Sequence, residues 1–300
     1  MVSSRGAVSV VVLCGLALGG LSCACLRGRR AGVVEEPERL TLTPKLRARC
    51  VEILRAGLRS GEFWPSMHAA EGLTLGGHAS EVRAFVEPKL EQESDDQKRC
   101  GLARELVRAG DRSKAAVMLD ILAKQDAYAH VHAAESLYKC GEMGKGCLLA
   151  AAMGEKDNPP LQLMAAAAVA RHGRDIGLRV LRKGLRDDDP KIQRIAVWAI
   201  ARVGDASDIP QLRANLKRAR DPIVRCQTEH ALATLGDPQG RQALARNLGS
   251  SDPKIRTYAA TFAGDAGMRS VAEQLIALLD DPNLDVRIRA AQSLLVLAKP

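Results

Sequence analysis

A glycine recurs seven times along this chain, at intervals of 31 to 33 residues. The recurring positions are Gly77, Gly110, Gly141, Gly173, Gly204, Gly236 and Gly267. A period of this length is typical of helical repeat arrays, in which each unit buries its apolar face only against its neighbours. The period therefore predicts that residues 43–300 form one elongated repeat domain, although 300 residues would ordinarily suggest about two domains.

The residues before each glycine predict the shape of one repeat. Four positions before the glycine stands an apolar residue, and eight positions before it stands a small or apolar residue in most repeats. Side chains four residues apart share one face of a helix, and small ones let a neighbouring helix approach closely. We expect the glycine to end this helix in the left-handed conformation, as at Gly204 and Gly236. A second amphipathic stretch follows each glycine, for example over residues 271–279.

Aspartate–proline pairs mark the starts of the next helices. These pairs are Asp189-Pro190, Asp221-Pro222, Asp252-Pro253 and Asp281-Pro282. Aspartate is a favoured N-cap, and proline is tolerated at the first helical position. The repeats contain no convincing alternation of the kind that predicts strands. The sequence thus predicts an all-α fold, a right-handed α-solenoid of about eight helix pairs.

The order Asp-Pro, Val-Arg or Ile-Arg, Ala-Ala and Gly-Asp resembles the short bacterial HEAT repeat, a type also found in phycobilisome-lyase-like proteins. The residues that carry the resemblance include Val224-Arg225, Ile255-Arg256, Val286-Arg287, Ala290-Ala291, Gly204-Asp205 and Gly236-Asp237. It covers roughly residues 43–300 and is strongest from residue 157 onward. The resemblance implies a solenoid and, for most such arrays, a scaffold that binds another protein.

Residues 1–26 are predicted to be a signal peptide or a membrane anchor. Arg5 precedes an uncharged stretch from Gly6 to Leu26, which contains the residues Ser22-Cys23-Ala24-Cys25. This order is typical of a bacterial export signal, with Cys23 or Cys25 as the lipidated residue. The alternatives are a cleaved secretory signal, no export, or an uncleaved anchor through residues 7–26, since about 20 apolar residues span a bilayer. We expect a periplasmic or cell-envelope lipoprotein, with residues 27–42 as a linker.

One tetrapeptide occurs twice, as His68-Ala69-Ala70-Glu71 and as His132-Ala133-Ala134-Glu135. A histidine and a glutamate three residues apart share a helix face, where both can bind one metal. The copies stand two repeats apart, which places them about 20 Å from each other, too far for a shared site. A family of HEAT-repeat hydroxylases uses adjacent His-Glu pairs, which this chain lacks. We therefore predict a structural role for His68, Glu71, His132 and Glu135, and no metal, cofactor or catalytic site. The alternative is a functional polar surface.

Two further features leave alternatives open. Trp64, next to Pro65 in the least typical repeat, is either a packing residue at a helix start or an exposed recognition residue. Outside the first 26 residues there are five cysteines, and no Cys-x-x-Cys pair. Cys140 and Cys147 flank a glycine-rich turn, so they are either a disulfide in an oxidising compartment or two small helix residues.

Positive charge is concentrated within residues 174–225. This segment has 13 Lys or Arg against seven Asp, in a chain whose formal net charge is +9. A basic groove there would bind nucleic acid. The segment has few aromatic residues for base stacking, and Asp187-Asp188-Asp189 interrupts it, so a solvated face is the preferred interpretation.

The sequence as a whole predicts a HEAT-repeat scaffold that is not an enzyme. It contains no nucleophile elbow, P-loop, dinucleotide fingerprint or zincin motif. We expect it to bind another protein on its concave face and to be tethered to the membrane through its N-terminal lipid or anchor. Two alternatives remain: a lyase-like or metal-dependent enzyme that uses the two His/Glu pairs, and a nucleic-acid-binding protein that uses residues 174–225.

Overall fold

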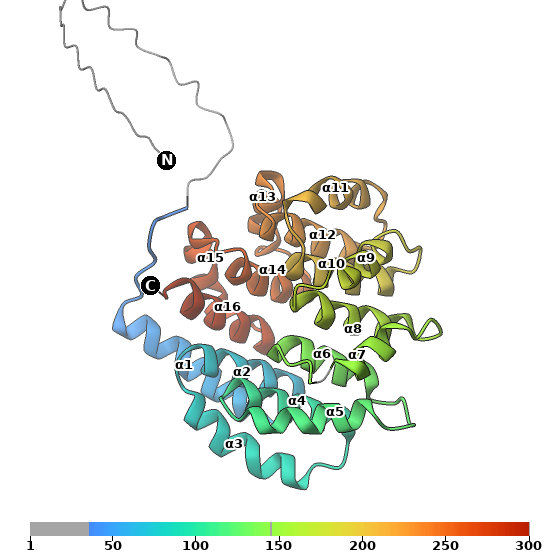
Figure 1. The fold of residues 1–300 in the computed structure, drawn as a ribbon. Helices are drawn as coiled ribbons and strands as arrows, with labels where there is room; N and C mark the ends of the chain where they lie inside the picture. The colour runs from blue at the N-terminus through green and yellow to red at the C-terminus, as the bar shows by residue number, and fades with distance from the viewer. Residues whose placement is uncertain (1–35, 145, 300) are drawn as a thin grey trace, which may run out of the picture. The chain divides into compact units, whose positions relative to one another are not determined.

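The computed structural model describes residues 36–144 and 146–299, and their regular secondary structure is entirely helical. The α-helices of these residues are α1 (Pro44–Leu58), α2 (Phe63–Leu75), α3 (Ala79–Gln92), α4 (Asp96–Arg108), α5 (Ala115–Leu122), α6 (His130–Cys140), α7 (Cys147–Met153), α8 (Pro159–Arg171), α9 (Asp175–Gly184), α10 (Pro190–Val203), α11 (Ile209–Arg218), α12 (Pro222–Thr234), α13 (Pro238–Asn247), α14 (Pro253–Asp265), α15 (Ala272–Ala277) and α16 (Leu284–Leu297). They form eight consecutive pairs, which confirms the predicted all-α solenoid (Figure 1).

Three of the four aspartate–proline pairs begin helices as predicted. The side chains of Asp189, Asp221 and Asp252 accept hydrogen bonds from backbone N–H groups in the first turns of α10, α12 and α14. The fourth pair differs, because the N-cap of α16 is Asn283. The carboxylate of Asp281 instead accepts two hydrogen bonds from the Arg256 guanidinium, at 2.7 and 3.0 Å. It therefore links α16 to the preceding repeat.

The recurring glycines are confirmed as left-handed residues at six of their seven positions, Gly236 among them with φ of 90°. The prediction was wrong for Gly204, which has φ of −84° and ψ of −177°. The reason for a glycine at position 204 is space. A Cβ atom there would lie 2.7 Å from the Ile200 carbonyl oxygen and 2.7 Å from a carboxylate oxygen of Asp208.

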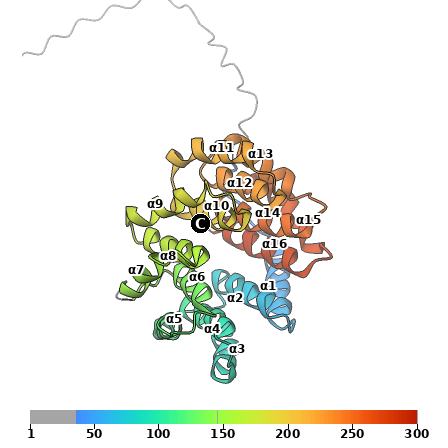
Figure 2. The same ribbon diagram turned by 90° about the vertical axis from the view of Figure 1, so that its right-hand side faces the viewer.

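The described residues from 36 onward form one compact unit, and the two helices of each pair take different places within it. In the view of Figure 2, the even-numbered helices surround a common centre and the odd-numbered helices lie outside them. Each even-numbered helix packs against the even-numbered helices on either side of it. Small residues permit this close approach: in α8, four consecutive alanines from Ala165 to Ala168 are buried.

The array closes into a ring, whereas the sequence predicts an elongated domain. The last helix, α16, packs against both helices of the first pair, α1 and α2. Gly57 in α1 makes this contact possible, because a Cβ atom at this position would lie 2.7 Å from Cδ1 of Ile288 in α16. The contact joins residues more than 200 positions apart, so the repeat period carries no sign of it. Ring closure turns the concave face of the solenoid into an internal cavity.

Candidate functional site: the cavity inside the ring

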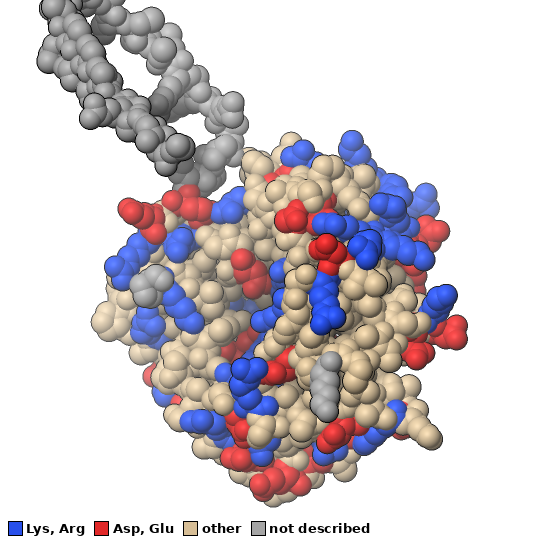
Figure 3. Space-filling model, in the orientation of Figure 1, with Lys and Arg blue, Asp and Glu red and all other residues tan. Residues whose placement is uncertain are grey.

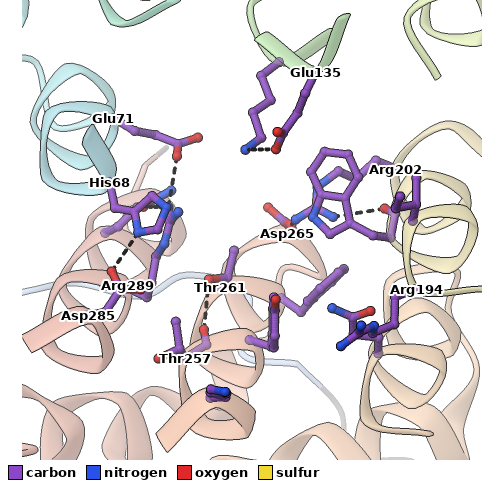
Figure 4. A pocket seen from close by; sticks show the side chains of 18 of the residues that line it. His68, Glu71, Glu135, Arg194, Arg202, Thr257, Thr261, Asp265, Asp285 and Arg289 are labelled. Atoms are coloured by element: carbon purple, nitrogen blue, oxygen red, sulfur yellow. Dashed lines mark hydrogen bonds and ion pairs between the residues drawn. The ribbon is translucent and has the colours of Figure 1, made fainter. Parts of the chain in front are cut away.

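The even-numbered helices enclose a cavity of about 860 Å³. Side chains from every even-numbered helix line it, from His68 on α2 to Gln292 on α16. Figure 4 shows His68, Glu71, Asp285 and Arg289 on one side of this space and Arg194 and Arg202 on the opposite side. The lining includes eight lysine or arginine side chains and four acidic ones. The cavity therefore carries an excess of positive charge.

The charges on one side of the cavity compensate one another. The carboxylate of Glu71 forms ion pairs with Arg108 at 3.0 Å and with Arg289 at 2.9 Å. Burial raises the pKa of Glu71, but the two guanidinium groups outweigh burial and hold this pKa well below its ordinary value. Glu135 pairs with Lys139 one turn later on α6, at 2.6 Å. The carboxylates of Glu71 and Glu135 are thus ionised and occupied by partners from the chain itself.

His68 and Asp285 form a hydrogen-bonded pair across the closure of the ring. The distance from Nδ1 of His68 to Oδ1 of Asp285 is 2.7 Å. Burial lowers the pKa of His68, and Arg289 lowers it further, against the opposing effect of Asp285. Burial raises the pKa of Asp285, but its hydrogen bond with His68 contributes to a net lowering. A neutral imidazole beside an ionised carboxylate must donate from Nδ1, so Nε2 of His68 is left as a hydrogen-bond acceptor.

Aromatic rings and Arg202 form the opposite wall. The Arg202 guanidinium lies 4.5 Å from the ring centroids of both Trp198 and Phe262. The same guanidinium donates to a carboxylate oxygen of Asp265 at 2.6 Å. Arg202 is therefore held between α10 and α14, and its charge is already paired with Asp265.

Three other cations in the cavity have no such partners. Lys191 and Arg194 on α10 and Lys254 on α14 line the cavity, and none of them forms an ion pair within the described part of the chain. Arg171 at the end of α8 is held by hydrogen bonds but not by a carboxylate. Among the described residues, its guanidinium donates to backbone carbonyl oxygens of Tyr138 and Lys139. The excess positive charge of the cavity is thus concentrated on the α10 and α14 side.

The predicted site residues are only partly brought together. His68, Glu71 and Glu135 line the cavity. The second histidine of the repeated tetrapeptide does not: the His132 ring packs against the Trp64 ring, with centroids 5.4 Å apart. Trp64 is 40% exposed and also contacts Phe63 edge to face. It is therefore a partly exposed packing residue outside the cavity.

The sequence analysis missed most of the cavity lining, although a signal for it exists. The lining is concentrated nine and six positions before the recurring glycine, or before Ala298 in the last repeat. The residues at these positions that line the cavity are His68, Glu71, Glu135, Met164, Ile195, Trp198, Gln227, Tyr258, Thr261, Arg289 and Gln292. The two His-Ala-Ala-Glu tetrapeptides are the most conspicuous residues at these two repeat positions. The recurrence of these positions identifies the helix face that points toward the cavity.

The basic segment 174–225 is divided between two surfaces. Arg182 on α9 pairs with Asp208 at 2.6 Å, and Arg213 on α11 pairs with Asp237. Lysine and arginine side chains gather over α9 and α11, at the upper right of Figure 3, with acidic side chains at their edge. Lys191 and Arg194 face the cavity instead. The basic residues of this segment therefore do not form one continuous groove.

The remaining predictions concern metals, cysteines and the N-terminal segment. Within residues 36–144 and 146–299, no group of three or more His, Cys, Asp or Glu side chains is placed to hold a metal ion. Cys140 and Cys147 are both free thiols, so the alternative of a disulfide between them is not observed. The predicted signal or anchor, with Cys23 and Cys25, lies outside the described residues. No helix of the described part has the length and apolar character to cross a membrane.

Comparison with known proteins gives the repeats a family. The family model for HEAT repeats matches residues 147–233 and 215–295. No curated protein matches the chain. Among solved structures, human deoxyhypusine hydroxylase in complex with glycerol is 19% identical, with 85% of this chain and 97% of that chain covered and a TM-score of 0.39. The complex of CpcE and CpcF of phycocyanin lyase from Nostoc sp. PCC7120 is 20% identical, with coverage of 87% and 98% and a TM-score of 0.37.

These similar structures correct one prediction. The prediction that the chain is not an enzyme is contradicted, because the two similar proteins are a hydroxylase and a lyase. At 19 and 20% identity, with TM-scores of 0.39 and 0.37, they assign no reaction to this chain. The fold and the family model agree with each other: the HEAT-repeat model matches residues 147–295, and the described part of the chain is helical and closes into a ring.

Proposed function

We propose that this protein binds a partner protein by taking an acidic segment of it into the cavity inside the ring. The observation that carries the proposal is the charge of the lining, which has eight lysine or arginine side chains against four acidic ones. Three of the cations, Lys191, Arg194 and Lys254, lack an ion pair within the described part of the chain. A ligand with several carboxylates would supply the missing partners.

The dimensions of the cavity support a segment rather than a whole domain as the occupant. A volume of about 860 Å³ lies within the range of about 300 to 1,000 Å³ that is typical of ligand sites. Charged side chains in a cleft with low-dielectric walls focus the electric field and attract ligands of opposite sign. An extended acidic segment meets both conditions, because it is narrow and carries its charges in a row.

The test is fluorescence anisotropy with the full chain and two labelled peptides of equal length, hexaglutamate and hexalysine. We expect hexaglutamate to bind and hexalysine not to bind. Because the attraction is electrostatic, the affinity for hexaglutamate should fall as salt rises from about 0.05 to 0.3 M. Equal binding of the two peptides, or no binding of hexaglutamate, would contradict the proposal.

A second candidate function is catalysis with His68 as a general base. It is supported by the hydrogen bond between Nδ1 of His68 and Asp285, which orients the imidazole, and by a pKa of His68 below its ordinary value. A general base needs such an orientation and a neutral ring nitrogen that a substrate can reach. Diethyl pyrocarbonate, which acylates accessible neutral imidazoles, should modify His68 at pH 7 and leave the fully buried His230 unmodified. An unmodified His68 would remove this candidate.

We also propose that the chain is exported and tethered through Cys23 or Cys25. The support is the order of residues 1–26, an arginine followed by an apolar stretch and then Ser22-Cys23-Ala24-Cys25. Replacing both cysteines by alanine should release the protein from the membrane fraction or block its processing. A double variant that stays in the membrane at full precursor mass would indicate an uncleaved anchor instead. A parent protein found in the soluble cytoplasmic fraction would refute export.

A further inference from the structure

We propose that Lys191, Arg194, Lys254 and Gln227 form a subsite for a carboxylate whose neighbouring group is a hydrogen-bond donor. The three cations would bind the carboxylate, and the side-chain oxygen of Gln227 would accept the hydrogen bond. In the acidic segment of the proposed function, the donor is a backbone N–H group. The proposed function supplies only the identity of the ligand as an acidic protein segment. The subsite itself can be tested with small molecules.

The repeat geometry places these residues within the first two turns of three neighbouring inner helices. Lys191 and Lys254 are the second residues of α10 and α14, and Arg194 is the fifth residue of α10. Gln227 is the sixth residue of α12, the helix that packs between α10 and α14. Neighbouring packed helices are about 8 to 10 Å apart, so the cations of α10 and α14 flank Gln227 from both sides. All four side chains line the same cavity.

The cations of the subsite are free to bind a ligand. The side chains of Lys191, Arg194 and Lys254 form no ion pair and no hydrogen bond among the described residues, whereas Arg108, Arg202 and Arg289 in the same cavity are held by carboxylates. Figure 4 shows Arg194 on the side of the cavity opposite Glu71 and Asp285, away from those acidic groups. The carboxylate of Asp265 on α14 also lines the cavity, but it is already paired with Arg202. A carboxylate that enters this side therefore meets three cations that have no ion pair among the described residues.

Gln227 supplies the second, independent observation. The residue is 3% exposed, and its Oε1 atom is buried and has no hydrogen-bond partner among the described residues. A buried acceptor without a partner costs about 1 to 3 kcal/mol, so native structures rarely leave one unsatisfied. A bare anion offers no donor to this oxygen. A carboxylate next to an N–H group satisfies the cations and the glutamine together.

The test compares two ligands that differ by a methyl group in place of the amide hydrogen. N-acetylglutamate carries two carboxylates and an N–H group, and its N-methyl derivative keeps the carboxylates and the acyl group but lacks the N–H. We expect the full chain to bind N-acetylglutamate at least about fivefold more tightly than the N-methyl compound in a calorimetric or NMR titration. In Gln227→Leu, the two ligands should bind equally.

The cations are tested with a pair of matched variants. The triple variant Lys191→Gln/Arg194→Gln/Lys254→Gln should bind N-acetylglutamate at least about tenfold more weakly than the parent. The control is Lys183→Gln/Lys217→Gln/Arg218→Gln, which removes the same charge from exposed residues of α9 and α11 outside the cavity. It should change the affinity less than about twofold. Equal losses in both triple variants would refute the subsite.

The outcomes separate the subsite from the proposed function. If N-acetylglutamate binds as expected and hexaglutamate does not, the subsite stands and the acidic protein segment is the wrong ligand. If hexaglutamate binds the parent and loses affinity in the cavity triple variant, while N-acetylglutamate does not bind, the function stands and the subsite is wrong. Absence of N-acetylglutamate binding, or a preference that persists in Gln227→Leu, also overturns the subsite.

Discussion

Nδ1 of His68, in the second helix of the array, lies 2.7 Å from Oδ1 of Asp285, in the last helix. One turn further along the same two helices, Glu71 pairs with Arg289 at 2.9 Å. These two contacts join the ends of the solenoid and form part of the cavity wall. These four side chains therefore belong both to the closure of the ring and to the wall of the candidate site.

The first prediction tests ring closure through Gly57. In an open solenoid, Gly57→Ala in the last turn of α1 should stabilise the protein by up to about 1 kcal/mol, because alanine favours a helix. In the closed ring the new Cβ atom meets Ile288, so we expect a loss of about 1 to 3 kcal/mol in the free energy of unfolding. The measurement is urea denaturation. In an Ile288→Ala background, the same change should become neutral or stabilising, and a loss that persists there would point away from closure.

The second prediction concerns the buried charges at the closure. Arg289→Met removes one of the two cations that pair with Glu71 and leaves its carboxylate with Arg108 alone. Breaking a buried ion pair from one side costs about 3 to 5 kcal/mol, and the remaining partner reduces this to an expected 2 to 4 kcal/mol. Thermal and urea unfolding measure the effect. Adding Glu71→Gln should recover part of the loss. A single variant within about 0.5 kcal/mol of the parent would show that the pair does not hold the ring.

The third prediction separates the roles of two recurring glycines. Gly236 has φ of 90° and no atom near the position of a Cβ, so Gly236→Val should lose about 1 to 2 kcal/mol through backbone strain, while Gly236→Asn should lose less. At Gly204 the limit is space, so even Gly204→Ala should destabilise the protein. Equilibrium unfolding of the three variants is the measurement. A destabilised Gly236→Asn together with an unchanged Gly204→Ala would reverse these assignments.

These two glycines also show how much of the fold the sequence predicts. The period and the aspartate–proline pairs predict eight helix pairs correctly, because each signal acts within one repeat or between neighbours. Gly204 differs because the carboxylate of Asp208, which accepts hydrogen bonds from Arg182 and from its own turn, fills the space beside it. A periodic pattern gives the same prediction at every repeat and cannot register such a local difference.

The candidate site was less predictable than the fold for a similar reason. His68 and Glu71 stand out as a repeated tetrapeptide, but their partners Asp285 and Arg289 lie at the other end of the chain and become neighbours only when the ring closes. In an open solenoid the first and last repeats are far apart, so the repeat pattern does not predict these contacts. Gln227 was missed because one glutamine is not a motif. Its significance comes from burial and the absence of a partner, which are properties of the folded chain.

The fourth prediction concerns pH. Burial lowers the pKa of His230 to about 3, whereas a histidine in an unfolded chain has a pKa of about 6.5. Between these values the unfolded chain binds a proton that the folded protein does not. The contribution of neutral His230 to the free energy of unfolding is therefore largest above pH 6.5. As the pH drops from 6.5 toward 3, this contribution decreases by about 1.4 kcal/mol for each pH unit.

The free energy of unfolding, measured with urea, should decrease from pH 6 to pH 5 in both proteins. We expect this decrease to be smaller by about 1 kcal/mol in His230→Leu than in the parent. The leucine keeps an apolar contact with Phe262, whose ring centroid lies 5.4 Å from that of His230. Because the change between pH 6 and pH 5 is measured within each protein, any loss of stability from the substitution that does not depend on pH cancels. Identical pH dependence in the two proteins would mean that His230 does not stay neutral in the fold.

The central claim is that ligands enter the cavity, and site-specific photocrosslinking tests it most directly. Trp198 lines the cavity, whereas Tyr128 is 58% exposed and lies outside it. Each is replaced in turn by p-benzoylphenylalanine, and the full chain is irradiated with labelled hexaglutamate. We expect a crosslink from position 198 that excess unlabelled peptide suppresses, and no specific crosslink from position 128. Crosslinking from position 128 alone, or equally from both positions, would contradict binding inside the ring.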